Sequence, residues 1–279
     1  AGMAQWQSND IFCRGSRQKS AFISSVAVQP SQRGRGIGHH LLRYIALEAA
    51  EQNIPLLLLI PQDAAYYQPL GFAWCYGLHQ YDMPLAALAE SLALTGPAIQ
   101  WGEIQEGEQP FSAYNDIYQT WTASWHGVPQ RDEKCWQHFW CDVRSEGGYG
   151  YLLTQSGLPA GYLVLWQKGD TMIVREMAWC NQDACRQLFY LLWQHRSQAK
   201  NFRWYAPVDP ICGLLLPQLS HGYHNRHLIQ GRITNIALAF HQLPLPAQWP
   251  KDLLLQIEDP LLPEQTGRWL LYAQEGYLK

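Results

Sequence analysis

A short run of glycines and arginines could hold an anion: Arg33, Gly34, Arg35, Gly36 and Gly38. A β-branched run ends just before it at Pro30, and an apolar-periodic helix, expected over residues 37–51, begins directly after it. A chain that leaves a strand through glycines and enters a helix presents several backbone N–H groups to one point, with the positive end of the helix dipole behind them. Glycine is expected there because a side chain would block the anion or forbid a turn with positive φ. The pattern therefore predicts a phosphate or diphosphate site.

Two other glycine-rich phosphate loops do not fit this stretch. A Walker loop ends on Gly-Lys-Ser or Gly-Lys-Thr, whereas His39 and His40 follow Gly38. A dinucleotide fingerprint needs Gly-x-Gly-x-x-Gly and, about 20 residues later, an acidic residue within a βαβ unit. The glycines at 34, 36 and 38 are spaced differently, and no parallel repeat follows the predicted strand at 55–60.

A pair of tyrosines is the second feature that could do chemistry. Tyr66 and Tyr67 follow the apolar run 55–60, and Tyr67 stands four residues before Gly71 and Phe72. A phenol, with a pKa of about 10, is a suitable proton donor to a thiolate of similar basicity. The alternative interpretation is that both tyrosines are core aromatics on a short helix.

Together these features resemble the GNAT superfamily of N-acyltransferases. The segment 33–38 fits its coenzyme A loop, Arg/Gln-x-x-Gly-x-Gly/Ala, and Tyr67 before Gly71-Phe72 fits its tyrosine signature. The resemblance implies acetyl-CoA as cosubstrate, no metal, and Tyr67 as general acid. In the family the strands that correspond to 23–28 and 56–60 splay apart, and the pantetheine arm enters the gap between them.

The resemblance also implies which residues contact the coenzyme. The arm pairs with the backbone near Val26 and Val28, and the N–H of Val26 polarises the thioester carbonyl. Gln62 and Asp63, at the end of the second strand, line the channel through main-chain contacts. The full expected set is Val26, Ala27, Val28, Arg33, Gly34, Arg35, Gly36, Ile37, Gly38, His39, Gln62 and Asp63.

Composition limits the class of protein. The chain has 279 residues, of which 47% are apolar and 15% charged, as in a globular protein of about two domains. The net charge is −3, and basic residues do not cluster outside Arg33 and Arg35, which argues against nucleic-acid binding. No apolar run reaches the length of a membrane span. An odd number of cysteines, 7, without tight pairing favours reduced thiols and a cytoplasmic location.

The predicted elements repeat within the chain. We expect an α+β fold with a mixed sheet, in which residues 1–95 form the coenzyme-binding unit. A linker is expected at 95–97. Residues 96–227 repeat the order of hairpin, strand, helix and strand, with the last three expected at 171–180, 182–194 and 202–206. The second strand-to-helix junction, 179–184, contains no glycine, and Asp183 would repel a diphosphate. We therefore expect the second unit not to bind acyl-CoA.

Tandem units of this kind resemble the Enhanced-intracellular-survival (Eis-like) acetyltransferases. Further matches are Gly127-x-x-x-Arg131 before Trp136, the stretch 161–163, and the stretch 231–235. The resemblance implies that residues 228–279 begin a sterol-carrier-protein-like domain and that the protein is a homo-oligomer, specifically a hexamer. It also implies that the chain is truncated at both ends, because the family has elements before residue 1. Its terminal carboxylate, which acts as the base, follows the position of Lys279.

The expected function is acetyl-CoA-dependent acetylation of a small primary amine, such as an aminoglycoside or a lysine side chain. The alternative is a non-catalytic module that binds acyl-CoA or a lipid or serves assembly. Two triplets spaced by three residues could suggest a metal: His221, His224 and His227, and Cys135, His138 and Cys141. Neither triplet has the matching second pair of a structural zinc site, so no metal is expected.

Overall fold

The computed structural model describes residues 1–13, 15–93, 103–106, 110–208, 216, 222–241, 243–245, 249 and 252–279. The chain divides into two compact units, each built from segments that are distant in sequence. Unit 1 comprises Ala1–Tyr76, Ser124–Gln130 and His227–Lys279, and unit 2 comprises Gly77–Ala123 and Arg131–Arg226. The three domains expected from the sequence stay a prediction, and the linker expected at 95–97 lies outside the described residues.

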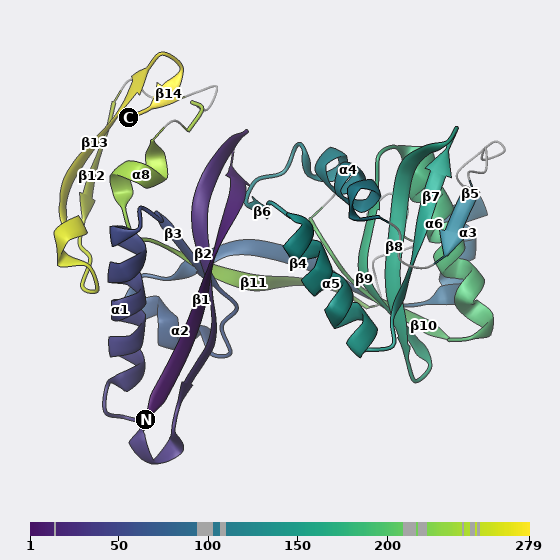
Figure 1. Cartoon of the computed structure of the whole chain (residues 1–279), viewed down its shortest axis with the longest axis horizontal. Coiled ribbons are helices and arrows are strands. Elements are labelled where there is room, and N and C mark those ends of the chain that lie inside the picture. Colours follow the sequence, from purple (N-terminus) through teal and green to yellow (C-terminus); the bar gives the residue numbers. More distant parts are fainter. Residues whose placement is uncertain are drawn as a thin grey trace. The chain divides into compact units, whose positions relative to one another are not determined.

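Unit 1 is built on a mixed sheet. Its spatial order is β11 (Tyr223–Ile233, shared with unit 2), β3 (Leu56–Leu59), β2 (Ser16–Val28), β1 (Gly2–Cys13) and β6 (Val128–Pro129). β1 and β2 form an antiparallel hairpin, and β2 pairs with β3 in parallel. Helix α1 (Ile37–Glu51) packs along β1 and β2 (Figure 1), and it has the bounds that the apolar periodicity predicted. Its buried residues Leu42 and Ile45 meet Ile23 and Leu57 of the strands, so burial of this face holds α1 on the sheet.

The C-terminal residues belong to unit 1. They form α8 (Ile236–Phe240), β12 (Asp252–Ile257), β13 (Gly267–Gln274) and β14 (Tyr277–Leu278), the last three as an antiparallel sheet. Between β12 and β13, Leu261 and Leu262 are buried in the same core as α1. This packing ties 228–279 to the unit that carries the glycine loop. A sterol-carrier-like domain in this region stays a prediction.

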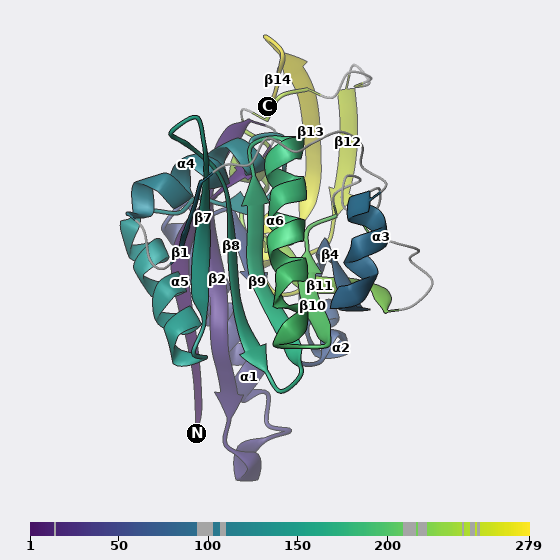
Figure 2. The same ribbon diagram turned by 90° about the vertical axis from the view of Figure 1, so that its right-hand side faces the viewer.

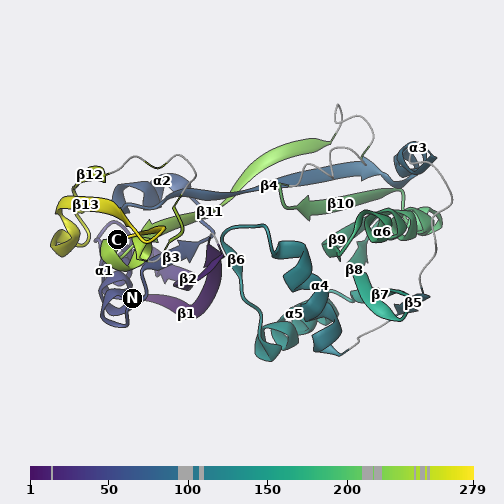
Figure 3. The same cartoon turned by 90° about the horizontal axis from the view of Figure 1, so that it is seen from above.

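Unit 2 has a sheet with helices on both faces. Its spatial order is β5 (Glu103–Glu106), β7 (Tyr149–Gln155), β8 (Leu158–Lys168), β9 (Thr171–Trp179), β10 (Asn201–Ala206) and β4 (Ala73–Pro84, which begins in unit 1). Helices α4 (Phe111–Thr122) and α5 (Glu133–Ser145) cover one face, and α3 (Leu88–Ala93) and α6 (Gln182–Gln194) cover the other (Figures 2 and 3). Single turns of 3-10 helix occur at Pro30–Gln32, Gln68–Leu70, Leu85–Ala87, His195–Ser197 and Pro263–Gln265.

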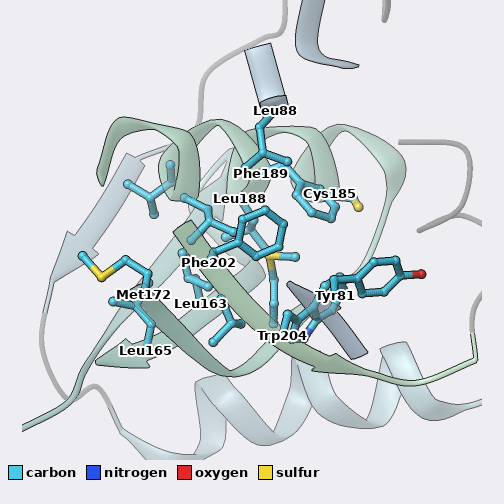
Figure 4. Packing of buried hydrophobic residues seen from close by; sticks show 14 of the residues in the cluster. Tyr81, Leu88, Leu163, Leu165, Met172, Cys185, Leu188, Phe189, Phe202 and Trp204 are labelled. Carbon is cyan, nitrogen blue, oxygen red and sulfur yellow. The ribbon is translucent and has the colours of Figure 1, made fainter. Parts of the chain in front are cut away.

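The core under α6 is densely aromatic and aliphatic. Figure 4 shows Leu188 and Phe189 of α6 lying over Phe202 and Trp204 of β10. The rings of Phe189 and Trp204 lie 5.8 Å apart, edge to face. Such packing excludes water from the centre of unit 2 and stabilises its fold.

A charged cluster is buried on the opposite face of unit 2. Arg131 donates two parallel hydrogen bonds to Glu176, of 2.7 and 2.6 Å, and the Tyr162 hydroxyl donates a third at 2.6 Å. The guanidinium also lies over the rings of Tyr118 and Trp136, 4.1 and 4.8 Å from their centres. The cluster therefore joins α4, α5 and the sheet through one satisfied ion pair.

Candidate active site

The loop between β2 and α1 has the conformation of an anion receptacle. Gly34 and Gly36 have φ of 77° and 76°, a region that L side chains rarely adopt. Gly36 is the N-cap of α1, and among the described residues no side chain caps this helix end or places a carboxylate in its first turn. The N–H groups of the first turn are thus left to a ligand or to water. Arg33 and Arg35 are exposed beside them, and Arg33 Nε donates to the Val28 carbonyl at 3.3 Å.

The parallel ladder beside this loop stops early. β2 and β3 pair from Ser20 opposite Leu56 to Ile23 opposite Leu59, where β3 ends. β2 continues to Val28, so its last residues have no partner in β3. The edge of β2 is therefore open at the place where the resemblance implies a splay.

A β-bulge marks the same point on the other side of β2. Gln5 faces Ser24 and Met3 faces Ala27, so Ser25 and Val26 together stand opposite a single residue of β1. Ser25 has φ of 54°, a strained value for a side chain that is not glycine. Bulges re-aim the backbone and commonly occur at active sites. Of the expected contact residues, Val26 is part of this bulge, and Ala27 and Val28 directly follow it.

Tyr67 ends the short helix α2 (Ala64–Tyr67), which follows β3. Asp63 caps α2 by accepting a hydrogen bond from the Ala65 N–H at 3.0 Å. The half-buried Tyr67 packs against the core under α1, with its ring 5.9 Å from that of Phe72. Burial raises the pKa of Tyr67, and the neighbouring Tyr66 raises it further, so the hydroxyl keeps its proton at neutral pH.

Gly38 is glycine for a different reason from Gly34 and Gly36. It lies inside the helix and is buried, and a Cβ there would overlap the hydroxyl of Tyr66. The motif thus contains two glycines that shape the turn and one that admits a tyrosine. The remaining expected residues lie nearby: Ile37 and His39 are in the first turn of α1, and the exposed Gln62 follows β3.

The sequence did not predict an ion pair between Arg232 and Asp259. Arg232 of β11, with 2% of its side chain exposed, donates to the Leu70 carbonyl and to both carboxylate oxygens of Asp259 at 2.6 Å. Asp259 also accepts the N–H groups of Leu261 and Leu262 at 3.0 and 2.8 Å. The available signal was the arginine between Gly231 and Ile233, within the stretch 231–235 that resembles the family. The pair links the turn after Tyr67 to the C-terminal segment.

Neutralising the carboxylate of Asp259 should weaken its ion pair with Arg232 and so destabilise the fold. We expect Asp259→Asn to lower the free energy of unfolding by about 1–3 kcal/mol, because the buried Arg232 loses a charged acceptor. Chemical denaturation of the variant and the wild type measures the difference. Glu264→Gln is the control. Glu264 lies in the 3-10 helix Pro263–Gln265 and forms no ion pair among the described residues. Equal effects of the two substitutions would contradict the prediction.

Unit 2 repeats the parallel ladder but has a shorter strand-to-helix junction. β9 and β10 pair in parallel from Thr171 opposite Asn201 to Val174 opposite Trp204, and β9 then runs on to Trp179. Only residues 180–181 separate β9 from α6, whereas residues 29–36 separate β2 from α1. The Asn181 side chain accepts the Ala184 N–H at 2.9 Å and so caps the helix end.

Aromatic rings also fill the end of this second ladder. Trp179 and Trp204 are buried, and their rings lie 6.3 Å apart, with Tyr81 stacked at 5.8 Å on Trp204. These features support the expectation that unit 2 does not bind acyl-CoA, which stays a prediction.

The described residues bring together no group of three or more His, Cys, Asp or Glu side chains that could hold a metal ion; His221 is outside them. Among the described helices, none has the length and hydropathy that crossing a bilayer requires.

Two parts of the chain match sequence models of known protein families. Residues 1–75 match one sequence model of the Acetyltransferase (GNAT) domain, and residues 127–233 match another. The chain contains two GNAT domains in tandem. This confirms the expected mixed α/β fold with paired GNAT units, and it indicates acyl transfer from acetyl-CoA or another acyl-CoA as the class of chemistry. No curated protein matches the chain in sequence.

Solved structures share this tandem GNAT fold. A GCN5-related N-acetyltransferase from Anabaena variabilis superposes with a TM-score of 0.81 and 22% identity, over 99% of this chain and 71% of that one. A probable N-acyltransferase from Enterococcus faecalis gives 0.87 and 18%, over 100% and 70%. Eis1 from Mycobacterium abscessus gives 0.74 and 16%, over 100% and 72%. At these identities the likeness concerns the fold.

Proposed function

We propose that this protein transfers the acetyl group of acetyl-CoA to a primary amine, and that unit 1 holds the active site. The observation that carries the proposal is the meeting of two features on one strand. β2 loses its parallel partner after Ile23, and it leads directly into the uncapped, glycine-lined end of α1. Acetyl-CoA supplies an activated acyl thioester. Tandem GNAT domains support the reaction class.

The geometry of unit 1 supports the following binding roles. The N–H groups of residues 36–39 bind the diphosphate, with the charges of Arg33 and Arg35 beside it. The open edge of β2 from Val26 to Val28 pairs with the amides of the pantetheine arm, as one strand pairs with another. The N–H of Val26 polarises the thioester carbonyl, and the bulge at Ser25 and Val26 supports this role.

Tyr67 completes the reaction as proton donor. The neutral amine attacks the thioester carbon, the carbon–nitrogen bond forms and the carbon–sulfur bond breaks. The departing thiolate takes the proton of Tyr67, the surplus proton of the amine leaves to solvent, and solvent returns a proton to Tyr67. A hydroxyl whose pKa is raised by burial keeps this proton available.

We place the protein in the Eis-like branch, with an acceptor such as an aminoglycoside or a lysine side chain and a hexameric assembly. The tandem GNAT domains and the fold shared with Eis1 support this placement. The closed second unit is consistent with one active site per chain.

Two measurements test the function. Isothermal titration calorimetry with acetyl-CoA and with CoA should show binding. A chromogenic reagent that reacts with thiols should report the release of free CoA when amines are added. Turnover with particular amines supports the enzyme. Absence of coenzyme binding would overturn the proposal, and binding without turnover across a broad amine panel would favour a non-catalytic acyl-CoA-binding module.

A matched pair of glycine substitutions tests the loop. Gly36 and Gly157 have φ of 76° and 78°, and Gly157 lies in the open β7–β8 turn of unit 2. Alanine in the left-handed region costs about 1–2 kcal/mol at either position. We expect Gly36→Ala to weaken acetyl-CoA binding about 5- to 30-fold, because the loop must keep this conformation to present its N–H groups. Gly157→Ala should leave the dissociation constant unchanged; equal values for both variants would argue against the loop.

A further inference from the structure

Tyr66 carries a hydroxyl that the proposed reaction does not use. The residue is 45% exposed, and its ring centre lies 5.0 Å from that of Tyr67 at an interplanar angle of 87°. Tyr67 packs against the core under α1. The two adjacent phenols therefore occupy different surroundings, and only one of them is needed as general acid.

The hydroxyl of Tyr66 lies over the first turn of α1. A Cβ added to Gly38 would overlap the Tyr66 hydroxyl, and Cγ2 of Val28 is 3.8 Å from that added Cβ. Tyr66 thus reaches from α2 to the place where the end of β2 and the start of α1 come together. In the described part of the chain this hydroxyl has no hydrogen-bond partner.

That position is where two binding surfaces meet. The N–H groups of 36–39 face a diphosphate, and the edge of β2 up to Val28 faces the pantetheine arm. We propose that the Tyr66 hydroxyl donates a hydrogen bond to the diphosphate of acyl-CoA at its junction with the arm, an inference that rests on the proposed function. Tyr66 is then a binding residue, and Tyr67 is the catalytic one.

The surroundings of Tyr66 suit a neutral donor. Burial raises the pKa of its hydroxyl, which therefore stays protonated and does not place a negative charge beside the anion. A hydrogen bond to a charged phosphate oxygen is stronger than one between neutral groups. Gly38 is the feature that makes room for it, which links the third glycine of the motif to coenzyme binding.

Tyr66→Phe tests the inference by removing the hydroxyl and keeping the ring. We expect the KM and Kd for acetyl-CoA to rise about tenfold or more, with kcat within about twofold of wild type. With S-acetylpantetheine, which has the thioester and lacks the diphosphate, variant and wild type should have the same kcat/KM. A purely structural role would affect both donors alike.

Other results would overturn it. Unchanged acetyl-CoA binding by Tyr66→Phe, or an equal loss with S-acetylpantetheine, removes Tyr66 as a diphosphate ligand. Tighter binding by Tyr66→Ala would show that the ring obstructs the coenzyme. If the wild-type protein binds no acetyl-CoA, the proposed function itself fails, whereas normal wild-type binding with an unaffected variant defeats only this inference.

A double substitution checks the position of the hydroxyl independently of the coenzyme. Gly38→Ala should destabilise the wild-type protein more than it destabilises the Tyr66→Phe variant, because the added methyl group overlaps the hydroxyl first. The ring carbon that bears the hydroxyl is 3.3 Å from the added Cβ, so some cost remains in both backgrounds. Equal destabilisation in the two backgrounds would place the hydroxyl elsewhere and contradict the inference.

Discussion

Replacing Tyr67 with phenylalanine is expected to lower kcat about 10²- to 10⁴-fold, the range that a positioned proton donor contributes. The substitution keeps the ring and its contact with Phe72, so the fold and the Kd for acetyl-CoA should be preserved. Steady-state kinetics with a reactive amine, together with isothermal titration, separate the two effects. The loss should appear in kcat and kcat/KM alike, as for an interaction made in the transition state.

Tyr44→Phe is the control for this substitution. Tyr44 lies on α1 and is 66% exposed, away from the core contacts of that helix. Its loss of a hydroxyl should leave kcat unchanged. Since the pKa of Tyr67 is raised above 10.0, the acid form persists through neutral pH and is lost only in strongly alkaline solution. Unchanged turnover by Tyr67→Phe at neutral pH would remove this residue from the mechanism and leave the coenzyme-binding proposal standing.

Removing the buried carboxylate of Glu176 in unit 2 should strongly lower the free energy of unfolding. We expect Glu176→Ala to lower the free energy of unfolding by about 3–5 kcal/mol, because Arg131 is left as an uncompensated charge. The two side chains are only 16% and 14% exposed, so water cannot replace the lost partner. Chemical denaturation, followed by tryptophan fluorescence, measures the change.

A surface pair provides the comparison. Asp10→Asn breaks an ion pair with Arg17, whose side chain is 67% exposed, and should cost under about 1 kcal/mol. Replacing both buried partners, as Arg131→Met with Glu176→Leu, should recover much of the loss because no charge stays buried. A small effect of Glu176→Ala, equal to that of Asp10→Asn, would contradict the argument.

The ion pair between Arg131 and Glu176 also predicts that the stability of the fold depends on pH. Burial alone would raise the pKa of Glu176, but the charge and hydrogen bonds of Arg131, with the hydroxyl of Tyr162, outweigh it and lower the pKa below 4.5. A carboxyl whose pKa is lower in the folded state stabilises that state above its unfolded pKa. This contribution is lost as the pH falls from about 4.5 through the folded value. The acid-induced loss of stability should therefore be smaller in the double variant than in the wild type.

Local pattern accounts for the elements that were predicted well. The glycine loop, the helix at 37–51 and the short apolar strand after it are encoded by neighbouring residues, since glycine tolerance of positive φ and apolar periodicity act over a few positions. The same kind of signal predicted the helix at 182–194 and a strand at 171–180, which in the structure ends one residue earlier, at Trp179. The roles of Val26, Gln62 and Tyr67 came from the family resemblance and stay predictions.

The amino-acid pattern was enough to predict a glycine-rich turn before a helix, a tyrosine pair after the next strand, and a second junction without glycine. Three features became visible in the folded chain alone: Gly38 makes room for Tyr66, Arg232 binds Asp259, and tryptophans fill the end of the second ladder. Backbone conformation depends mainly on adjacent residues, so local pattern predicts it. Contacts such as Arg232 with Asp259 depend on which distant side chains the folded sheet brings together.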